Sequence, residues 1–188
     1  MSGIRVIAGS ARGRRLRLVP GEGTRPISDR VKESLFNIIG PDIQEARLLD
    51  LFAGTGSVGI EALSRGAAGV VFVDNAQRAI ATVHANLKST GMGGQGAEVV
   101  CADSFVLLGQ GPRWKFDYVY VAPPQYHELW ANAVTALDAH PGWLNPDAWV
   151  IAQMHPKEYH ELQLARLHMA DQRRYGSTLL VFYEFPGE

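Results

Sequence analysis

The stretch at residues 48–59 constrains this chain most, because it predicts a buried strand, a glycine turn and the start of a helix. The apolar residues before Asp50 are typical of a parallel strand that is covered on both faces. The pattern G-x-G-x-x-G follows at Gly54, Gly56 and Gly59. Glycines in this pattern allow a tight turn, close approach of a ligand to the backbone, and close packing of helix on strand. The helix that begins near Ser57 points free N–H groups into the turn, which favours an anion such as a carboxylate or phosphate.

Short apolar runs alternate with helical patterns along the rest of the chain. Strands are predicted at residues 69–73, 97–101, 116–121, 149–153, 162–169 and 177–185. Helices are predicted at residues 57–66, 75–90 and 129–137. This alternation is typical of an α/β fold with a mostly parallel sheet, right-handed crossovers and helices on both faces. The last two strands follow each other without a long helix, which indicates an antiparallel addition at the edge of the sheet.

The first 26 residues are predicted to form a basic arm and connector ahead of a main domain at residues 27–188. The arm begins with a short β-ribbon, whose strands are expected at residues 4–8 and 15–19. Such a ribbon buries little of itself, so its arginines are expected to be available. Residues 1–32 hold eight basic and two acidic residues, whereas the remaining residues hold ten basic and 17 acidic ones. This asymmetry favours a polyanionic partner at one end, and the alternative is a solvated, mobile terminus.

A helix is predicted after Ser28, which can cap it, and Asp29 is favourably placed in its first turn. Its apolar face consists of Val31, Leu35, Phe36 and Ile39. Arg25, Arg30 and Lys32 lie near its start, where cations oppose the helix dipole. That local cost is easier to understand if an anion binds there.

Composition narrows the class of protein. At 188 residues the chain is one domain with an added arm. The single cysteine, Cys101, excludes an internal disulfide framework and fits a reducing compartment. No apolar run approaches the roughly 20 residues of a membrane span, and no signal peptide opens the chain. We therefore expect a cytoplasmic protein without a membrane partner, and the histidine spacing predicts no metal site.

Ligands in open parallel sheets bind outside the carboxyl ends of the strands, where the strand order reverses. The predicted strands bring to this edge Asp50, the glycine turn, Asp74, Asp103 and the turn at residues 122–125. Asp74 lies 20 residues after Gly54, where a carboxylate can accept both hydroxyls of a ribose. Asp74 and Asp103 are also open to interpretation as helix caps, and Glu61 as a solvated side chain. The glycine pattern alone would also suit an NAD-dependent oxidoreductase.

The strand at residues 116–121 ends in Ala122-Pro123-Pro124, and this turn decides against NAD. Two consecutive prolines after a buried strand make a rigid, extended turn at the ligand edge. The combination resembles amino-group methyltransferases that use S-adenosylmethionine, whose motif is Asp/Asn-Pro-Pro-aromatic.

A second resemblance is more specific and covers almost the whole chain. Residues 4–9, 12–16 and above all 24–37, TRPISDRVKESLFN, resemble the N-terminal signature of the RsmD family. Residues 50–66, DLFAGTGSVGIEALSRG, are similar to that family's cofactor motif, and Tyr175-Gly176 before a terminal strand also fits. The family methylates the exocyclic N2 of one guanine in bacterial small-subunit (16S) rRNA.

This resemblance implies a Rossmann-like methyltransferase sheet of seven strands with S-adenosylmethionine as cofactor. The methionine part of the cofactor would lie over Gly54 to Gly56, its ribose on Asp74, and its adenine near Asp103 and Ser104. The cofactor-binding residues so implied are Asp50, Phe52, Ala53, Gly54, Thr55, Gly56, Asp74, Asn75, Asp103 and Ser104.

The resemblance also assigns the reaction and the RNA. In the family's motif a side-chain oxygen and a proline carbonyl accept the hydrogens of the guanine amine, and the aromatic residue stacks the base. The catalytic residues so implied are Ala122, Pro123, Pro124, Gln125 and Tyr126. RNA phosphates would be held by Arg12, Arg14, Arg15 and Arg17, with Arg25, Arg30 and Lys32 near the target base. The expected partner is small-subunit rRNA or a ribosomal assembly particle, bound by a monomer.

The chain departs from the motif at two positions. Ala122 stands where Asp or Asn is expected, and Gln125 stands at the aromatic position, with Tyr126 one place later. Loss of one acceptor would raise the barrier by about 2–4 kcal/mol. The open alternatives are an impaired or inactive relative that acts as an RNA-binding module and, more weakly, an NAD-dependent oxidoreductase. Pro123-Pro124 could also be a plain rigid turn, and Tyr126 could pack against Trp130 on one helix face.

Overall fold

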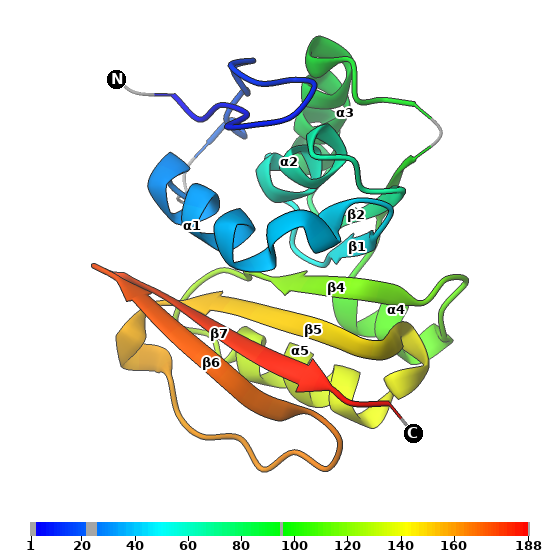
Figure 1. The fold of residues 1–188 in the computed structure, drawn as a ribbon, viewed down its shortest axis with the longest axis vertical. Coiled ribbons are helices and arrows are strands. Elements are labelled where there is room, and N and C mark those ends of the chain that lie inside the picture. The colour runs from blue at the N-terminus through cyan, green and yellow to red at the C-terminus, as the bar shows by residue number, and fades with distance from the viewer. Residues whose placement is uncertain (1–2, 22–25, 95, 188) are drawn as a thin grey trace.

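The computed structural model describes residues 3–21, 26–94 and 96–187, which form an α/β fold around one sheet (Figure 1). The strand order is β3-β2-β1-β4-β5-β7-β6. The strands are β1 (Arg47–Asp50), β2 (Gly69–Asp74), β3 (Ala97–Cys101), β4 (Phe116–Val121), β5 (Leu144–Met154), β6 (His168–Tyr175) and β7 (Thr178–Phe185). The helices are α1 (Asp29–Ile39), α2 (Ser57–Ser64), α3 (Gln77–Thr90), α4 (Ser104–Gln110) and α5 (Leu129–Ala139), with short 3-10 turns η1 (Gly40–Ile43), η2 (Pro141–Trp143) and η3 (Pro156–Glu158).

The strand order reverses between β1 and β4, which are parallel neighbours. Asp50 at the end of β1 pairs with Tyr120 near the end of β4. The carboxyl ends of these strands therefore meet at the switch point, where ligands bind in sheets of this kind. Strand β7 is antiparallel to both β5 and β6. This arrangement differs from the dinucleotide-binding order 3-2-1-4-5-6 and argues against the NAD alternative.

Each face of the sheet has its own apolar core. One core joins the arm, α1 and α3 to the sheet through residues such as Leu35, Val83, Phe72 and Phe182. The other joins α4 and α5 to the opposite face, around Leu108, Trp130, Val119 and Val181. In Figure 1, α5 runs behind the strands while α1 and the arm lie on the other side. The parallel sheet is thus covered on both faces, as its apolar strands predict.

Most of the predicted elements are confirmed, but the strand predicted at residues 162–169 is wrong, since β6 begins at His168. Most β6 side chains are exposed, so this edge strand has no apolar alternation to reveal it. The residues before it follow an irregular path that is held by one carboxylate. Asp138 accepts the N–H groups of Ala165, Arg166 and Leu167 at 2.8–2.9 Å. Burial opposes ionisation of Asp138, but these three donors lower its pKa.

Strand β5 is longer than the predicted 149–153, and helix α4 was not predicted as an element. Helix α1 follows the prediction closely. The Ser28 hydroxyl accepts the N–H of Val31, and the helix ends at Gly40. No helix in the described part of the chain has the length and apolarity needed to cross a bilayer.

The arm forms less strand than predicted and buries more. Its two halves make one antiparallel bridge, Arg5 to Arg15, flanked by hydrogen bonds such as that from Leu16 N to Ile4 O at 2.9 Å. The apolar side chains between the arginines are buried in the core beneath: Ile4, Val6, Ala11 and Leu16. The expectation that the ribbon buries little of itself is therefore wrong.

Candidate active site

The three glycines after β1 are explained by backbone conformation at two positions and by close packing at the third. Gly54 and Gly56 have φ of 55° and 77°, a region that side chains disfavour. A side chain at Gly54 would meet nothing within 4 Å among the described atoms, so its backbone faces open space. A Cβ on Gly59 would clash with the Phe72 ring, with Cζ at 2.7 Å. The turn is thus open to a ligand on one side and packed tightly against β2 on the other.

Two carboxylates flank this turn. Asp74 Oδ2 accepts the N–H of Gly54 at 2.9 Å, and Oδ1 accepts the N–H of Ala76 at 2.9 Å. Asp74 thereby ties the end of β2 to the glycine turn, and Ala76 rather than Asp74 is the N-cap of α3. Both oxygens keep a lone pair for a further donor such as a ribose hydroxyl.

Asp50 is the second carboxylate, and it lies deep in the protein interior. Its side chain is 1% exposed, and Oδ1 has no hydrogen-bond partner among the described residues. Burial, together with the charge of Asp74, raises the pKa of Asp50 to about 7, although the N–H of Gly59 acts in the opposite direction. An orphaned buried carboxylate oxygen beside an open turn is the partner that a ligand ammonium would require.

Asp103 and Ser104 lie at the start of α4. Asp103 Oδ1 accepts the N–H groups of Phe105 and Val106 at 2.9 and 3.0 Å, so the capping interpretation holds for it. The buried Ser104 hydroxyl donates to the carbonyl of Leu51, which links α4 to the residue after β1. Phe52 and Phe105 contact each other edge to face, with ring centroids 6.3 Å apart. Half-buried aromatic edges and a capped helix start thus border the glycine turn, while Asn75 is exposed.

The proline turn leaves β4 at the same edge. Ala122 is half-buried and Pro123 buried, whereas Pro124, Gln125 and Tyr126 are exposed. The interpretation that Tyr126 packs against Trp130 is wrong. The Tyr126 ring contacts His155, and the buried Trp130 stacks on Tyr159 with centroids 6.1 Å apart. Tyr126 therefore lies ahead of the helix that follows it, which begins at Leu129.

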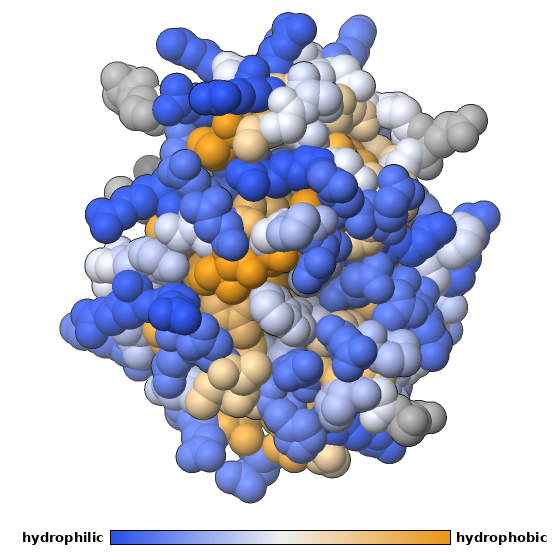
Figure 2. All heavy atoms as spheres, in the orientation of Figure 1, coloured by the Kyte–Doolittle hydropathy of each residue, from blue (hydrophilic) through white to orange (hydrophobic). Residues whose placement is uncertain are grey.

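The arginines of the arm are exposed to solvent. They are Arg5, Arg12, Arg14, Arg15 and Arg17; Arg30 in α1 is also exposed, and Arg25 lies outside the described residues. Figure 2 shows strongly hydrophilic side chains projecting at the top, where Figure 1 places the arm.

Lys32 is not part of this exposed set, so its assignment to RNA is wrong in this structure. Its side chain is 0% exposed, and Nζ donates to Arg5 O at 2.6 Å and to Ser57 Oγ at 2.9 Å. Burial lowers the pKa of Lys32, although the nearby Glu61 carboxylate raises it. The ammonium is therefore bonded to groups in the protein interior and is not accessible to an RNA phosphate.

Glu61 is the residue that sequence reasoning missed. It is fully buried rather than solvated, and it accepts the N–H groups of Ile7 and Ala8 at 2.8 and 3.0 Å. It also pairs with Arg65 at 2.8 Å and with Lys32 at 3.4 Å. The signal in the sequence was a single acidic residue within the apolar segment of α2. A carboxylate at such a position is rarely buried unless it is paired, so it indicates a buried partner.

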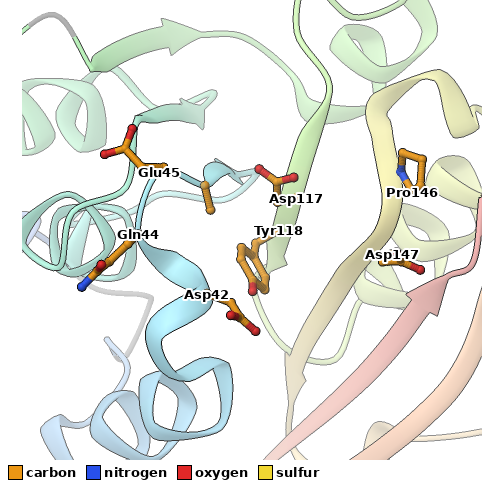
Figure 3. A pocket seen from close by; sticks show the side chains of 8 residues that line it. Asp42, Gln44, Glu45, Asp117, Tyr118, Pro146 and Asp147 are labelled. Atoms are coloured by element: carbon orange, nitrogen blue, oxygen red, sulfur yellow. The ribbon is translucent and has the colours of Figure 1, made fainter.

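Two cavities lie at the other end of the strands, near their amino ends. One, of about 320 Å³, is lined by Asp42, Gln44, Glu45, Asp117, Tyr118 and Asp147 (Figure 3). Tyr118 stands near the start of β4, four residues before Ala122, and its ring lies between η1 and the strand. The second, of about 350 Å³, lies beside Arg47 and Trp114. Neither includes a residue of the glycine or proline turn, and no group of three or more metal-ligating side chains was found among the described residues.

A family model, described as conserved hypothetical protein 95, matches residues 4–184. The chain belongs to this family. Ribosomal RNA small subunit methyltransferase D of Haemophilus influenzae is 38% identical over 151 residues, which are 80% of this chain and 78% of that protein. The resemblance of the sequence to the RsmD family is thereby confirmed.

Solved structures agree with the family assignment. The structure of yhhF from Escherichia coli is 31% identical, with a TM-score of 0.85 over 98% of both chains. An RNA methyltransferase from Salinibacter ruber, in complex with S-adenosyl-L-homocysteine, is 16% identical, with a TM-score of 0.66 over 87% of this chain and 95% of that one. This second likeness bears on the fold alone, and the predicted α/β fold with a seven-stranded, mostly parallel sheet is confirmed.

Proposed function

We propose that this chain transfers a methyl group from S-adenosylmethionine to the exocyclic N2 amine of a guanine in small-subunit rRNA. The observation that carries the proposal is the pairing of β1 with β4. It brings the Asp50 end of one strand and the Ala122 turn of the other to a single switch point. A donor held at the first and an acceptor held at the second would be neighbours. The name of the H. influenzae relative supports rRNA as the substrate.

The residues around the glycine turn suit each part of the cofactor. When bound, S-adenosylmethionine supplies a methyl group activated by a sulfonium charge. The free N–H groups at the start of α2 suit its carboxylate, and the orphaned Asp50 Oδ1 suits its ammonium. Asp74 would accept the ribose hydroxyls, and Phe52, Asp103 and Ser104 would border the adenine.

The proline turn would orient and polarise the guanine amine. That amine is a poor nucleophile because its lone pair is delocalised into the ring. The carbonyls of Ala122 and Pro123 would accept its hydrogens, and the Gln125 amide oxygen could replace the missing acidic or amide side chain. Pro123 and Pro124 fix the backbone there, so the acceptors would not have to reorganise during the reaction.

The exposed arginines of the arm would hold the RNA. Arg12, Arg14, Arg15 and Arg17 would contact phosphates, and Arg30 would lie nearer the target base. Phosphate contacts give affinity and register rather than sequence choice. A monomer that acts in the cytoplasm on naked rRNA or on an assembly particle fits this description.

The experiment is transfer of labelled methyl groups to small-subunit RNA that lacks its natural methylation, offered naked and as particles. Digestion of the product to nucleosides should show the label in N2-methylguanosine. Asp74→Asn, which keeps the shape but loses the charge, should weaken cofactor binding. Label in another nucleoside would refute the assignment to N2, and no label at all, with S-adenosylhomocysteine bound normally, would refute the catalytic role.

A second candidate is an RNA-binding relative without activity, favoured by the missing acceptor at Ala122. The variant Ala122→Asp separates the two. A large gain in transfer would indicate that the natural turn has decayed. A loss would indicate that the Ala-Pro-Pro-Gln turn is functional as it stands.

A further inference from the structure

Tyr126 combines high exposure with a strained backbone. Its side chain is 64% exposed, so burial contributes little to holding it. Its φ of 64° lies in the left-handed region, which is uncommon and unfavourable for an aromatic residue. Strain of this kind persists only where other contacts impose it, and it concentrates at functional sites.

Glu158 supplies the contact that imposes the strain. Its Oε1 accepts the N–H of Tyr126 at 2.6 Å, and its Oε2 accepts the N–H of His155 at 3.1 Å. A single carboxylate thereby joins the proline turn after β4 to η3 after β5. Because β4 and β5 are parallel neighbours, with Val121 opposite Ala152, both segments lie at the carboxyl edge of the sheet.

His155 completes the group. Its Nδ1 accepts the N–H of Lys157 at 3.1 Å, which fixes the ring orientation and leaves Nε2 as the donor nitrogen of the neutral ring. The rings of His155 and Tyr126 lie 5.9 Å apart between centroids, with an angle of 36° between their planes. Two aromatic rings are thus held next to the turn that would present acceptors to the guanine amine.

We propose that Tyr126 and His155 form the stacking site for the unpaired target base, and that Glu158 is the positioning residue that holds Tyr126 in place. This inference rests on the proposed function. The chain has Gln125 where the motif has its aromatic residue. The left-handed backbone at Tyr126 would place the ring of Tyr126 in the stacking site instead. Neither His155 nor Glu158 belongs to the motif, since both come from the connection after β5.

The test is a double-mutant cycle on methyl transfer and on binding of single-stranded RNA. Stacking of a base on an aromatic residue implies a loss of about 5- to 150-fold in Tyr126→Ala. Tyr126→Phe keeps the ring and should stay within about threefold of the natural protein. Glu158→Gln, which loses one of the two accepted hydrogen bonds, should lower kcat or RNA affinity by about tenfold while S-adenosylhomocysteine affinity stays unchanged. The exposed Glu161→Gln is the matched control and should leave all of these quantities unchanged.

Non-additivity decides whether Glu158 acts through Tyr126. In the Tyr126→Ala background, Glu158→Gln should have a clearly smaller effect, because only its contact with His155 is left to act, whereas an undiminished tenfold loss there would overturn the positioning role. Equal losses in Tyr126→Phe and Tyr126→Ala would overturn the stacking role. The proposed function is judged separately, by whether the natural protein transfers methyl groups. If it does not, RNA affinity still tests the platform, and unchanged RNA affinity in Tyr126→Ala would overturn it.

Discussion

Lys32 Nζ lies 3.4 Å from Glu61 Oε2, and neither side chain is exposed to solvent. The pair stands where three elements meet. Lys32 belongs to α1 and Glu61 to α2, and Glu61 also accepts backbone N–H groups of Ile7 and Ala8 in the arm. One buried ion pair therefore joins α1 to α2, and hydrogen bonds between its two side chains and the backbone of the arm hold the arm to both helices.

Removing one partner of this pair should destabilise the whole molecule. Lys32→Met leaves the Glu61 carboxylate buried with Arg65 as its remaining cation. A wholly uncompensated buried charge costs about 3–5 kcal/mol, and because Arg65 still pairs with Glu61 the free energy of unfolding in urea should fall by somewhat less than that. Glu33→Gln, at the exposed neighbouring position, is the control and should change it by less than about 0.5 kcal/mol. A loss below about 1 kcal/mol in Lys32→Met would show that the pair is not a structural link.

The raised pKa of Asp50 makes stability depend on pH in a defined direction. The folded protein holds this proton up to about pH 7, whereas the unfolded chain releases it near 3.8. The contribution of protonated Asp50 is therefore fully present below about pH 4 and is lost as pH rises through about 7. Relative to Asp50→Asn, the natural protein should lose up to about 4 kcal/mol of unfolding free energy over this range. A difference that does not vary with pH would contradict the shift.

Cofactor affinity should show the opposite trend. An ammonium on Asp50 requires the ionised carboxylate, so S-adenosylhomocysteine should bind roughly tenfold more weakly at about pH 6 than at about pH 7.5. Calorimetry at the two pH values measures this ratio. Asp50→Asn should bind weakly at both pH values, with the ratio close to one. A steep ratio that survives in Asp50→Asn would assign the titration to another group.

The close packing of α2 on β2 predicts a contrast between two glycines. Gly59→Ala places a methyl group against the Phe72 ring and 2.8 Å from Val70 Cγ1, which should cost about 1–3 kcal/mol of unfolding free energy. Gly109 lies in the exposed part of α4, with nothing within 4 Å of an added Cβ among the described atoms. Gly109→Ala should therefore stabilise by about 0.4–1 kcal/mol. Urea unfolding measures both changes in unfolding free energy. Equal effects at the two positions would contradict the close packing of α2 on β2.

The arm predicts a change in the salt dependence of RNA binding. Replacing Arg12 and Arg14 together by Gln removes two candidate phosphate contacts from the exposed surface. The slope of log affinity against log salt should flatten by about 1.4, at roughly 0.7 per contact with single-stranded RNA. Arg174→Gln on the edge strand β6 is the matched control. An unchanged slope in the double variant would place the RNA elsewhere.

Local sequence was sufficient for the elements that bury apolar side chains in a regular pattern. Strands β2, β3 and β4 and the Ser28 cap of α1 lie where the pattern places them. Strand β6 does not, because its exposed residues carry no alternation. The glycine turn was predictable because its positive φ angles and its close packing on β2 favour glycine at these positions.

The polar interactions of the site needed tertiary contacts that no local pattern encodes. Lys32 and Glu61 are 29 residues apart, and a lysine beside an arginine near a helix start resembles a surface feature. The bond from Tyr126 to Glu158 spans 32 residues and depends on β4 and β5 being neighbours. Residues of this kind are found only once the sheet order is known.

The path of the arm is set by its main-chain groups rather than by its arginines. Ile7, Ala8 and Arg17 donate their N–H groups to Glu61 and Asn86 of the main domain. The guanidinium groups at positions 12, 14, 15 and 17 take no part in these hydrogen bonds. Under the proposed function, substitutions at these four positions would change RNA affinity while leaving intact the hydrogen bonds that hold the arm in place.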